Sequence, residues 1–275
     1  MRQNGQGATG TLDDVSGRPP TVLALHGQPG TGRDFAALAR TLDGTCRVVA
    51  PDRPGWGSRA AEPAGGFAAG AADAVAILDR EGVEQAVVLG FSWGGGVALE
   101  LARRYPDRVG GLVLAASIGP AEPTAVDRML AMPVAGTAIC AGGLAATRLV
   151  LRRPAVHGIL GGGMKGVDRT DVLHFADHCL RPDALDSFMV EQRALVREWG
   201  GVVRELGGVR VPTIVVSGER DRLIAPASPR GLAEAIPGAE LRIIPGAGHF
   251  LPGVSPALLA EAVTAVATRA GLAAG

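Results

Sequence analysis

The chain has 275 residues, of which 47% are hydrophobic and 20% charged, and its 27 basic residues balance 27 acidic ones. This composition excludes a disordered protein, because the apolar side chains suffice for a sizeable core. The zero net charge gives no electrostatic signature of binding to nucleic acid or to an anionic membrane. We therefore expect one large domain, or one domain with an insertion, and neither of these two kinds of partner.

The three cysteines, Cys46, Cys140 and Cys179, lie far apart and lack the close pairing of a zinc site or a redox motif. We expect buried, unpaired thiols and no bound metal. Residues 1–20 are polar and glycine-rich, without the apolar segment of a secretion signal, and predict a flexible arm. A cytoplasmic location fits these features, whereas the sequence does not indicate the oligomeric state.

The first half of the chain alternates between predicted strands and predicted helices. Short runs of β-branched and aliphatic residues predict strands at residues 21–26 and 47–50, with a helix at residues 35–42 between them. The alternation then continues with a helix at residues 67–81, a strand at 85–90, a helix at 93–105 and a strand at 109–116. This pattern is typical of an α/β protein with a mostly parallel, doubly wound sheet.

Residues 119–208 show no convincing strand pattern, only helical stretches with a glycine run at residues 161–163. A loop of that length without structure is improbable in a compact domain, so we interpret the segment as an inserted helical cap. Strands at residues 211–217 and 240–244 and a helix at residues 256–270 follow. The sheet domain would thus comprise residues 21–118 and 209–275.

One part of this insertion, residues 129–147, carries no charged side chain. Its length is close to that of a membrane-spanning helix, but Pro133 and Gly136, Gly142 and Gly143 interrupt it. Much of the remainder is Ala and Thr, which favour insertion into a membrane only weakly. We expect no membrane span and interpret the segment as an apolar lid or a core helix.

The strongest functional signal is G-F-S-W-G at residues 90–94, between a predicted strand and a predicted helix. In this setting G-x-S-x-G is typical of a sharp turn that holds the serine, here Ser92, in a strained conformation with its hydroxyl exposed. Gly90 and Gly94 are needed because a Cβ at either position would crowd the turn. Ser92 is therefore the predicted nucleophile.

A serine nucleophile needs a histidine base and an acid that orients the base. His249 follows the strand at residues 240–244, at the strand end where open α/β sheets build their sites. His26, His157, His174 and His178 are the other histidines, three of them within the insertion. Asp221 follows the strand at residues 211–217 and is the predicted acid, with Glu219, Glu122 and Asp127 as alternatives. The order Ser92, Asp221, His249 matches this type of site.

Attack on a carbonyl also needs backbone N–H groups that stabilise the negative oxygen. The amide of Trp93, which follows the nucleophile, is one predicted donor. The second comes from H-G-Q-P-G at residues 26–30, where Gly27 lets the backbone approach and the amide of Gln28 can point inward. Pro29 cannot donate.

These motifs, with D-R-P-G-W-G-S-R at residues 52–59, resemble the successive motifs of the α/β-hydrolase fold family, serine branch. The resemblance implies that residues 52–59 form a structural loop beside the site and that His26 and Pro29 shape the oxyanion loop. It also implies a shortened opening hairpin, because few residues precede His26. Epoxide hydrolases and haloalkane dehalogenases are disfavoured, since position 92 is serine and Tyr105 is the one tyrosine.

The predicted activity is hydrolysis of an ester or related acyl bond of a small to medium hydrophobic molecule, without a cofactor. Apolar residues of the cap could cover such a substrate or form the cap's own core. H-G-x-P-G and Ser-Trp-Gly also resemble proline iminopeptidases, in which Glu191, Glu198 or Glu205 would receive the substrate amine. A perhydrolase, a carbon–carbon bond hydrolase, a thioesterase, a natural-product lyase or cyclase, and a binding protein remain alternatives.

Overall fold

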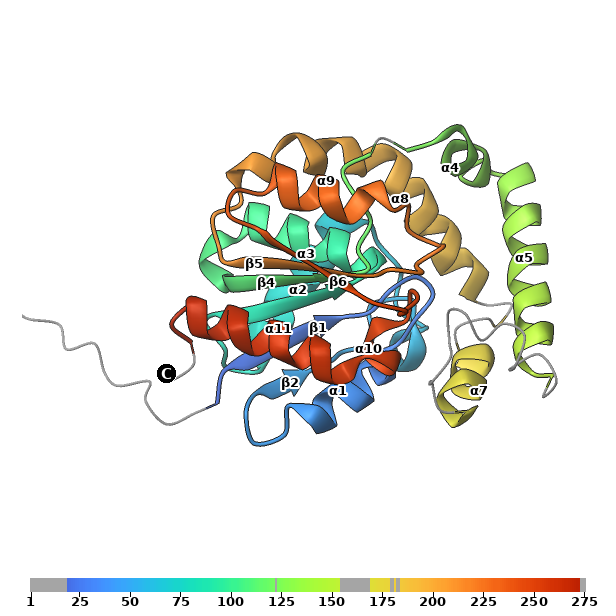
Figure 1. Cartoon of the computed structure of the whole chain (residues 1–275). Helices are drawn as coiled ribbons and strands as arrows, with labels where there is room; N and C mark the ends of the chain where they lie inside the picture. Colours follow the sequence, from blue (N-terminus) through green and yellow to red (C-terminus); the bar gives the residue numbers. More distant parts are fainter. Residues whose placement is uncertain (1–18, 122, 154–168, 179–180, 182–183, 273–275) are drawn as a thin grey trace, which may run out of the picture.

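The computed structural model describes residues 19–121, 123–153, 169–178, 181 and 184–272 (Figure 1). Nearly all of the predicted arm, the glycine run at residues 161–163 and any opening hairpin lie outside these residues. Six parallel strands form one sheet in the order β2-β1-β3-β4-β5-β6. They are β1 (Thr21–Leu25), β2 (Arg47–Val49), β3 (Ala86–Phe91), β4 (Val109–Ala115), β5 (Thr213–Gly218) and β6 (Glu240–Ile244). The predicted α/β class is confirmed.

Helices cover both faces of the sheet, because successive side chains of each buried strand point to opposite faces. Val22 and Ala24 of β1 pack toward one face, and Leu23 and Leu25 pack toward the other. The first face is covered by α1 (Ala36–Thr41), α10 (Leu251–Val254) and α11 (Pro256–Arg269), and the second by α2 (Phe67–Arg80), α3 (Trp93–Arg104), α8 (Ala184–Arg204) and α9 (Ala227–Ala235).

Among the described residues, four short 3-10 helices and two short α-helices were not predicted. The 3-10 turns are η1 (Gly32–Phe35), η2 (Gly57–Arg59), η3 (Pro106–Arg108) and η5 (Leu206–Gly208). The unpredicted α-helices are α9 and α10, which contain Pro229 and Gly231, and Pro252 and Gly253, respectively. These residues obscure a helical pattern in the sequence, although Pro is compatible with the first turn of a helix.

Between β4 and β5 the described residues form helices and no strand. They are α4 (Ala125–Leu130), α5 (Ala135–Leu151), α7 (Arg169–His178) and α8, which we call the cap helices. In Figure 1, α4, α5 and α7 lie beyond one end of the sheet, whereas α8 extends back over it. The helical content of this segment is as predicted.

The uncharged segment at residues 129–147 covers the end of α4, a connecting loop and most of α5. Among the described residues, no helix combines the length and the apolar character needed to cross a membrane. The segment is not a core helix either, since α5 buries Gly136, Cys140 and Leu151 while Ile139 and Leu149 are largely exposed. Most of the segment therefore belongs to α5, a helix with much of its surface exposed.

The helix α3 packs directly on the end of β1 at Gly94. A Cβ at this position would lie 2.1 Å from the carbonyl oxygen of Leu25 and 2.7 Å from that of His26. Backbone atoms of a buried strand cannot move aside without disturbing the sheet. The absence of a side chain at Gly94 is therefore what allows this approach.

We expect Gly94→Ala to lower the free energy of unfolding by at least about 1–3 kcal/mol, because it overpacks the interface between α3 and β1. Gly143→Ala is the matched control, since Gly143 lies on the exposed surface of α5 and a Cβ added there would have no atom within 4 Å. Helix propensity predicts that this change raises stability by roughly 0.5–1 kcal/mol. Urea unfolding checks both, and equal effects of the two variants would contradict the packing argument.

Candidate active site

Ser92 lies in the turn between β3 and α3 with φ 53° and ψ −115°. This conformation is strained for a residue with a side chain and is held by its neighbours. The amide of Ser92 donates to the carbonyl of Ala115 at 3.0 Å, and its carbonyl accepts from the amide of Gly95 at 3.0 Å. A Cβ at Gly90 would lie 2.5 Å from the carbonyl oxygen of Gly94, so both glycines of the motif are needed for the turn.

Asp221 and His249 come together at the carboxyl ends of β5 and β6. The distance from His249 Nδ1 to Asp221 Oδ2 is 2.8 Å, and both side chains are buried. The other carboxylate oxygen accepts from the amides of Leu223 and Ile224 at 2.9 and 3.0 Å. Burial opposes ionisation, but His249 and these two amides outweigh it and lower the pKa of Asp221. The ionised Asp221 therefore keeps a proton on Nδ1 and leaves Nε2 as the basic nitrogen.

The imidazole of His249 lies beside the residue that precedes Ser92. The ring of Phe91 is 5.1 Å from that of His249, measured between centroids. Within the part of the chain that the structure describes, the hydroxyl of Ser92 makes no hydrogen bond, to His249 or to another group. Catalytic hydrogen bonds are often long or poorly aligned when no substrate is bound.

The alternative acids have other roles in the structure. Glu219 is exposed and accepts from the amide of Gly246 at 2.8 Å. Asp127 caps α4, where it accepts from the amide and hydroxyl of Thr124. Glu122 lies outside the described residues.

The other histidines lie in different surroundings. His26 is fully buried, and its Nε2 accepts from the amide of Arg53 at 2.9 Å. Burial and then the charge of Arg53 lower the pKa of His26 well below its ordinary value. His174 and His178 belong to α7, and His157 lies outside the described residues.

The loop after β1 lies against the serine. A Cβ at Gly27 would be 3.1 Å from the Cβ of Ser92, so a side chain there would separate the two segments. Among the described residues, neither the amide N–H of Gln28 nor that of Trp93 has a hydrogen-bond acceptor in the protein. The side chain of Gln28 points elsewhere, donating from Nε2 to the carbonyl of Phe188 in α8 at 2.8 Å. Two free backbone donors thus flank the turn at Ser92.

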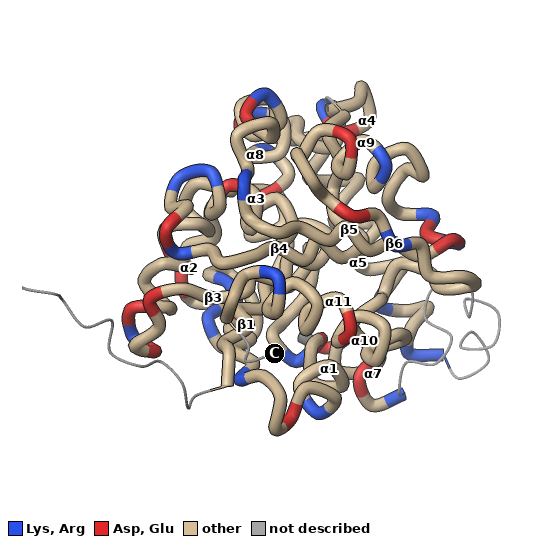
Figure 2. The backbone as a smooth tube through the Cα atoms, turned by 60° about the vertical axis from the view of Figure 1, so that its left-hand side comes forward, with Lys and Arg blue, Asp and Glu red and all other residues tan. Residues whose placement is uncertain are grey.

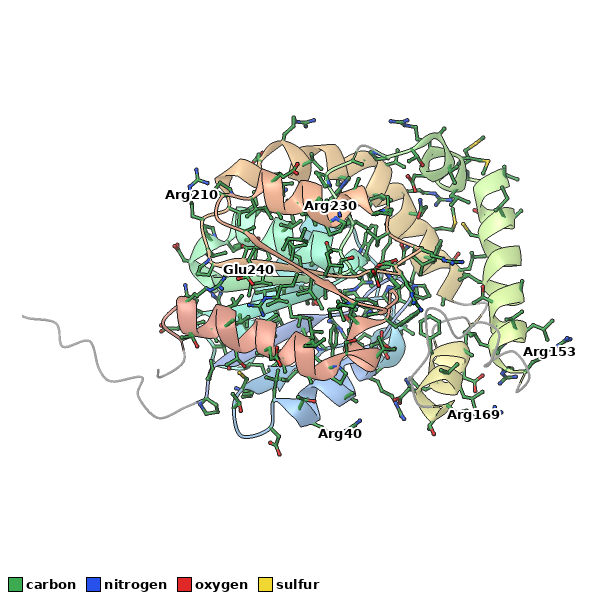
Figure 3. All side chains as sticks on the ribbon, viewed as in Figure 1. Arg40, Arg153, Arg169, Arg210, Arg230 and Glu240 are labelled. Carbon is green, nitrogen blue, oxygen red and sulfur yellow. The ribbon has the colours of Figure 1, made fainter. Side chains whose placement is uncertain are left out.

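The segment at residues 52–59 contributes more than a structural loop. Arg53 is buried and donates from Nε to the carbonyl of His26 at 3.1 Å and from Nη2 to that of Gly27 at 2.9 Å. Its guanidinium also forms a buried ion pair with Glu191 of α8, which accepts from Trp56 Nε1 at 2.9 Å. In contrast to the buried Arg53, the side chain of Arg40 extends outward from the protein (Figure 3).

Sequence reasoning assigned no role to Arg53. The one signal for it is topological, since the segment follows β2, the neighbour of β1 in the sheet. Parallel neighbours end at the same edge, so their following loops meet there. The partner Glu191 is 138 positions away in the sequence, and no local pattern connects the two residues.

The three cap glutamates have partners within the protein. Glu191 pairs with Arg53, Glu198 accepts from the amide of Ala68 at 3.3 Å, and Glu205 pairs with Arg103 at 2.9 Å. Burial raises the pKa of Glu191, and the charge and hydrogen bonds of Arg53 offset part of this effect. The buried Glu191 carboxylate, already bound to Arg53 and Trp56, is therefore not free to receive a substrate amine.

No group of three or more metal-ligating side chains occurs among the described residues. Cys46 and Cys140 are buried free thiols, as predicted, and Cys179 lies outside the described residues. Basic and acidic segments are interspersed along the tube in Figure 2.

The alpha/beta hydrolase family model matches residues 22–262 of the chain. A curated relative, the uncharacterized protein Rv2715 of Mycobacterium tuberculosis, is 28% identical over 86% of this chain and 72% of its own length. Another, 2-hydroxymuconate semialdehyde hydrolase of Pseudomonas putida, is 28% identical over 88% of this chain and 84% of its own. Among solved structures, the N-acyl homoserine lactone degrading enzyme Est816 is 26% identical with a TM-score of 0.63, over 89% of this chain and 92% of that one.

The chain belongs to the alpha/beta hydrolase family. The parallel sheet with its flanking helices has the fold of that family, as the resemblance implied. The protein is a hydrolase of this fold, and the bond that it cleaves is a separate question.

A partly buried carboxyl group, that of Asp34, lies next to the loop after β1. Asp34 Oδ2 accepts from the amide of Thr31 at 3.2 Å, and a Cβ at Gly30 would lie 2.7 Å from it. Burial raises the pKa of Asp34 from 3.8 to about 7, with a further contribution from the like charges of Asp52 and Asp171. The amide of Thr31 opposes this shift.

We expect Asp34→Asn to change how stability depends on pH. The folded protein holds the Asp34 proton up to about pH 7, whereas the unfolded chain releases it near pH 3.8. The stability linked to this proton is therefore complete below the lower value and is lost as the pH rises through the higher one. The free energy of unfolding of the wild type, minus that of Asp34→Asn, should decrease between about pH 4 and pH 7. Urea unfolding across this range checks it, and a constant difference would contradict the assignment.

Proposed function

We propose that the protein is a serine hydrolase that cleaves an ester or related acyl bond of a small to medium hydrophobic molecule. The observation that carries the proposal is the hydrogen bond between Asp221 and His249 at the edge of the sheet where the strained turn presents Ser92. The two free amides beside that turn, of Gln28 and Trp93, add the groups that acyl transfer needs.

In the proposed mechanism Ser92 Oγ attacks the substrate carbonyl carbon while His249 Nε2 takes the hydroxyl proton. Asp221 stays ionised, because its pKa is lowered, and stabilises the imidazolium through Nδ1. The amides of Gln28 and Trp93 donate to the negative oxygen. The intermediate then collapses, His249 returns the proton to the leaving group, and an acyl-enzyme forms on Ser92.

Water completes the reaction by the same steps. His249 Nε2 accepts a proton from the water as its oxygen attacks the acyl carbonyl, and the proton then passes to Ser92 Oγ as the acid leaves. Each proton passes between His249 and Ser92, the leaving group or the attacking water, so the substrate and water are the reactants that the mechanism needs. We further propose that residues 119–208 act as the cap over this site, with α8 beside the loop after β1.

We expect Ser92→Ala to reduce turnover of p-nitrophenyl esters by roughly 10⁴-fold or more, because it removes the attacking oxygen. A fluorophosphonate probe should label the wild type on one residue, Ser92, detected as a mass shift of its peptide. Ser117→Ala is the matched control, since this nearby buried serine donates to the carbonyl of Ile118 and should leave labelling intact. An unlabelled wild type, or turnover retained by Ser92→Ala, would show that no acyl-enzyme forms and would favour a binding protein or a lyase.

The assignment of the acid has its own test. Asp221→Asn should lower kcat by roughly 10³- to 10⁴-fold, because the amide no longer stabilises the imidazolium or fixes the tautomer of His249. Glu219→Gln, two residues away, should change kcat little, since Glu219 contacts the amide of Gly246 and not His249. Steady-state kinetics on one ester distinguishes them, and a larger loss in Glu219→Gln would reverse the assignment.

Carbon–carbon bond hydrolysis is the second candidate. It is favoured by the 28% identity to 2-hydroxymuconate semialdehyde hydrolase over most of both chains. The same proposed serine, base and acid would serve either reaction. Parallel assays with an ester and with 2-hydroxymuconate semialdehyde separate the candidates by their relative kcat/KM.

A further inference from the structure

Glu191 is a carboxylate in an unusual place. It lies within α8 and its side chain is 0% exposed, where an acid is expected only with strong partners. Those partners are the guanidinium of Arg53 and the indole N–H of Trp56. All three side chains are buried, and the ion pair joins a cap helix to the segment after β2.

The rest of the Arg53 guanidinium is directed at the loop that carries Gln28. Nε donates to the carbonyl of His26 and Nη2 to that of Gly27. The backbone amide of Arg53 donates to His26 Nε2, so His26 carries its proton on Nδ1 and donates it to the same Gly27 carbonyl at 2.9 Å. The Gly27 oxygen therefore accepts from two buried side chains.

The direction of the Gly27 carbonyl fixes the direction of the Gln28 amide. Both groups belong to one planar peptide, and in a trans peptide the C=O and the N–H point in opposite directions. Donors that hold the Gly27 oxygen toward Arg53 therefore turn the Gln28 N–H away from Arg53, in a loop that packs against Ser92 at Gly27.

We propose that Arg53 and Glu191 are positioning residues for the oxyanion hole. Arg53 orients the peptide between Gly27 and Gln28, and Glu191 fixes and neutralises Arg53 from α8. This inference rests on the proposed acyl-transfer function. It predicts that Glu191, a residue of the cap helices, is needed for turnover even of substrates too small to be covered by the cap.

The cap helix itself offers a matched control for this proposal. Glu198 lies two turns further along α8 and also joins α8 to the sheet domain, through the amide of Ala68 at the start of α2. Among the described residues, no hydrogen bond or ion pair joins Glu198 to the loop after β1. If Glu191 only attached α8 to the sheet domain, substitution of Glu191 and substitution of Glu198 would have similar effects on kcat.

The first test compares Glu191→Gln with Glu198→Gln on p-nitrophenyl acetate and on a longer-chain ester. We expect Glu191→Gln to lower kcat roughly 10- to 100-fold on both, less than complete loss of an oxyanion donor, with KM changed less than about threefold. The rate of inactivation by a fluorophosphonate should fall in parallel, because that reaction also places a negative oxygen in the hole. Glu198→Gln should retain wild-type kcat.

A second comparison separates positioning from stability. Arg53→Met leaves the buried Glu191 carboxylate unpaired and should lower both Tm and kcat, whereas the double variant Arg53→Met with Glu191→Met removes both charges and should recover much of the Tm. Its kcat should stay low, because the donors that Arg53 supplies to the carbonyls of His26 and Gly27 are then missing.

The outcomes are distinct. A wild type that neither turns over esters nor labels at Ser92 would overturn the proposed function together with this inference. If the wild type is active, three results would overturn the inference alone. A folded Glu191→Gln variant could keep its kcat, or its defect could be confined to KM. The double variant could also recover its kcat together with its Tm.

Discussion

The site depends on one close approach, that of α3 to the end of β1. Because Gly94 has no side chain, the turn at Ser92 lies directly over the last residues of the strand. That contact brings the loop after β1 against Ser92, where Gly27 again has no side chain to separate them. The loop that carries Gln28 therefore lies against the turn that carries Trp93, although the two residues are far apart in the sequence.

Ion pairs on the surface and the buried ion pair beside the site differ in what they contribute to the protein. Exposed pairs such as Arg33 with Asp171 contribute about 0–1 kcal/mol each, since water screens them and both side chains lose freedom. The buried pair of Arg53 and Glu191 incurs a desolvation cost that often cancels its attraction. A net gain in stability is thus a poor explanation for it, whereas the orientation of two carbonyl groups is a specific one.

The sequence predicted those features that depend on short-range patterns. All six strands form within two residues of their predicted bounds, because buried parallel strands are continuous apolar runs ended by polar or glycine-rich loops. The pairing of Asp221 with His249 was predicted from their positions in the sequence. Each residue follows one of two neighbouring strands, and the carboxyl ends of these strands lie at the same edge of the sheet.

The features that the sequence did not predict depend on long-range side-chain packing. Nothing near Glu191 distinguishes it from Glu198 or Glu205 on the same predicted helices, and only the approach of α8 to the loop after β2 decides which one meets Arg53. The short helix α9 was missed because Pro229 and Gly231 lie within it. The raised pKa of Asp34 likewise follows from burial and from two carboxylates brought near by the fold.

The cap helices differ in how they are joined to the sheet domain, and this difference limits which of them can move independently. Trp199 of α8 packs 5.3 Å from Phe67, between ring centroids, and donates to the carbonyl of Gly119, so α8 shares the core of α2 and α3. The helices α5 and α7 instead form a small apolar cluster of their own, which meets Phe250, the neighbour of His249, through Phe175. Displacing α8 would expose a shared core and release the Arg53 pair, whereas displacing α5 and α7 would disturb a smaller contact. Of the cap helices, α8 is therefore the one most firmly joined to the sheet domain, and it is also the one that carries the partner of Arg53.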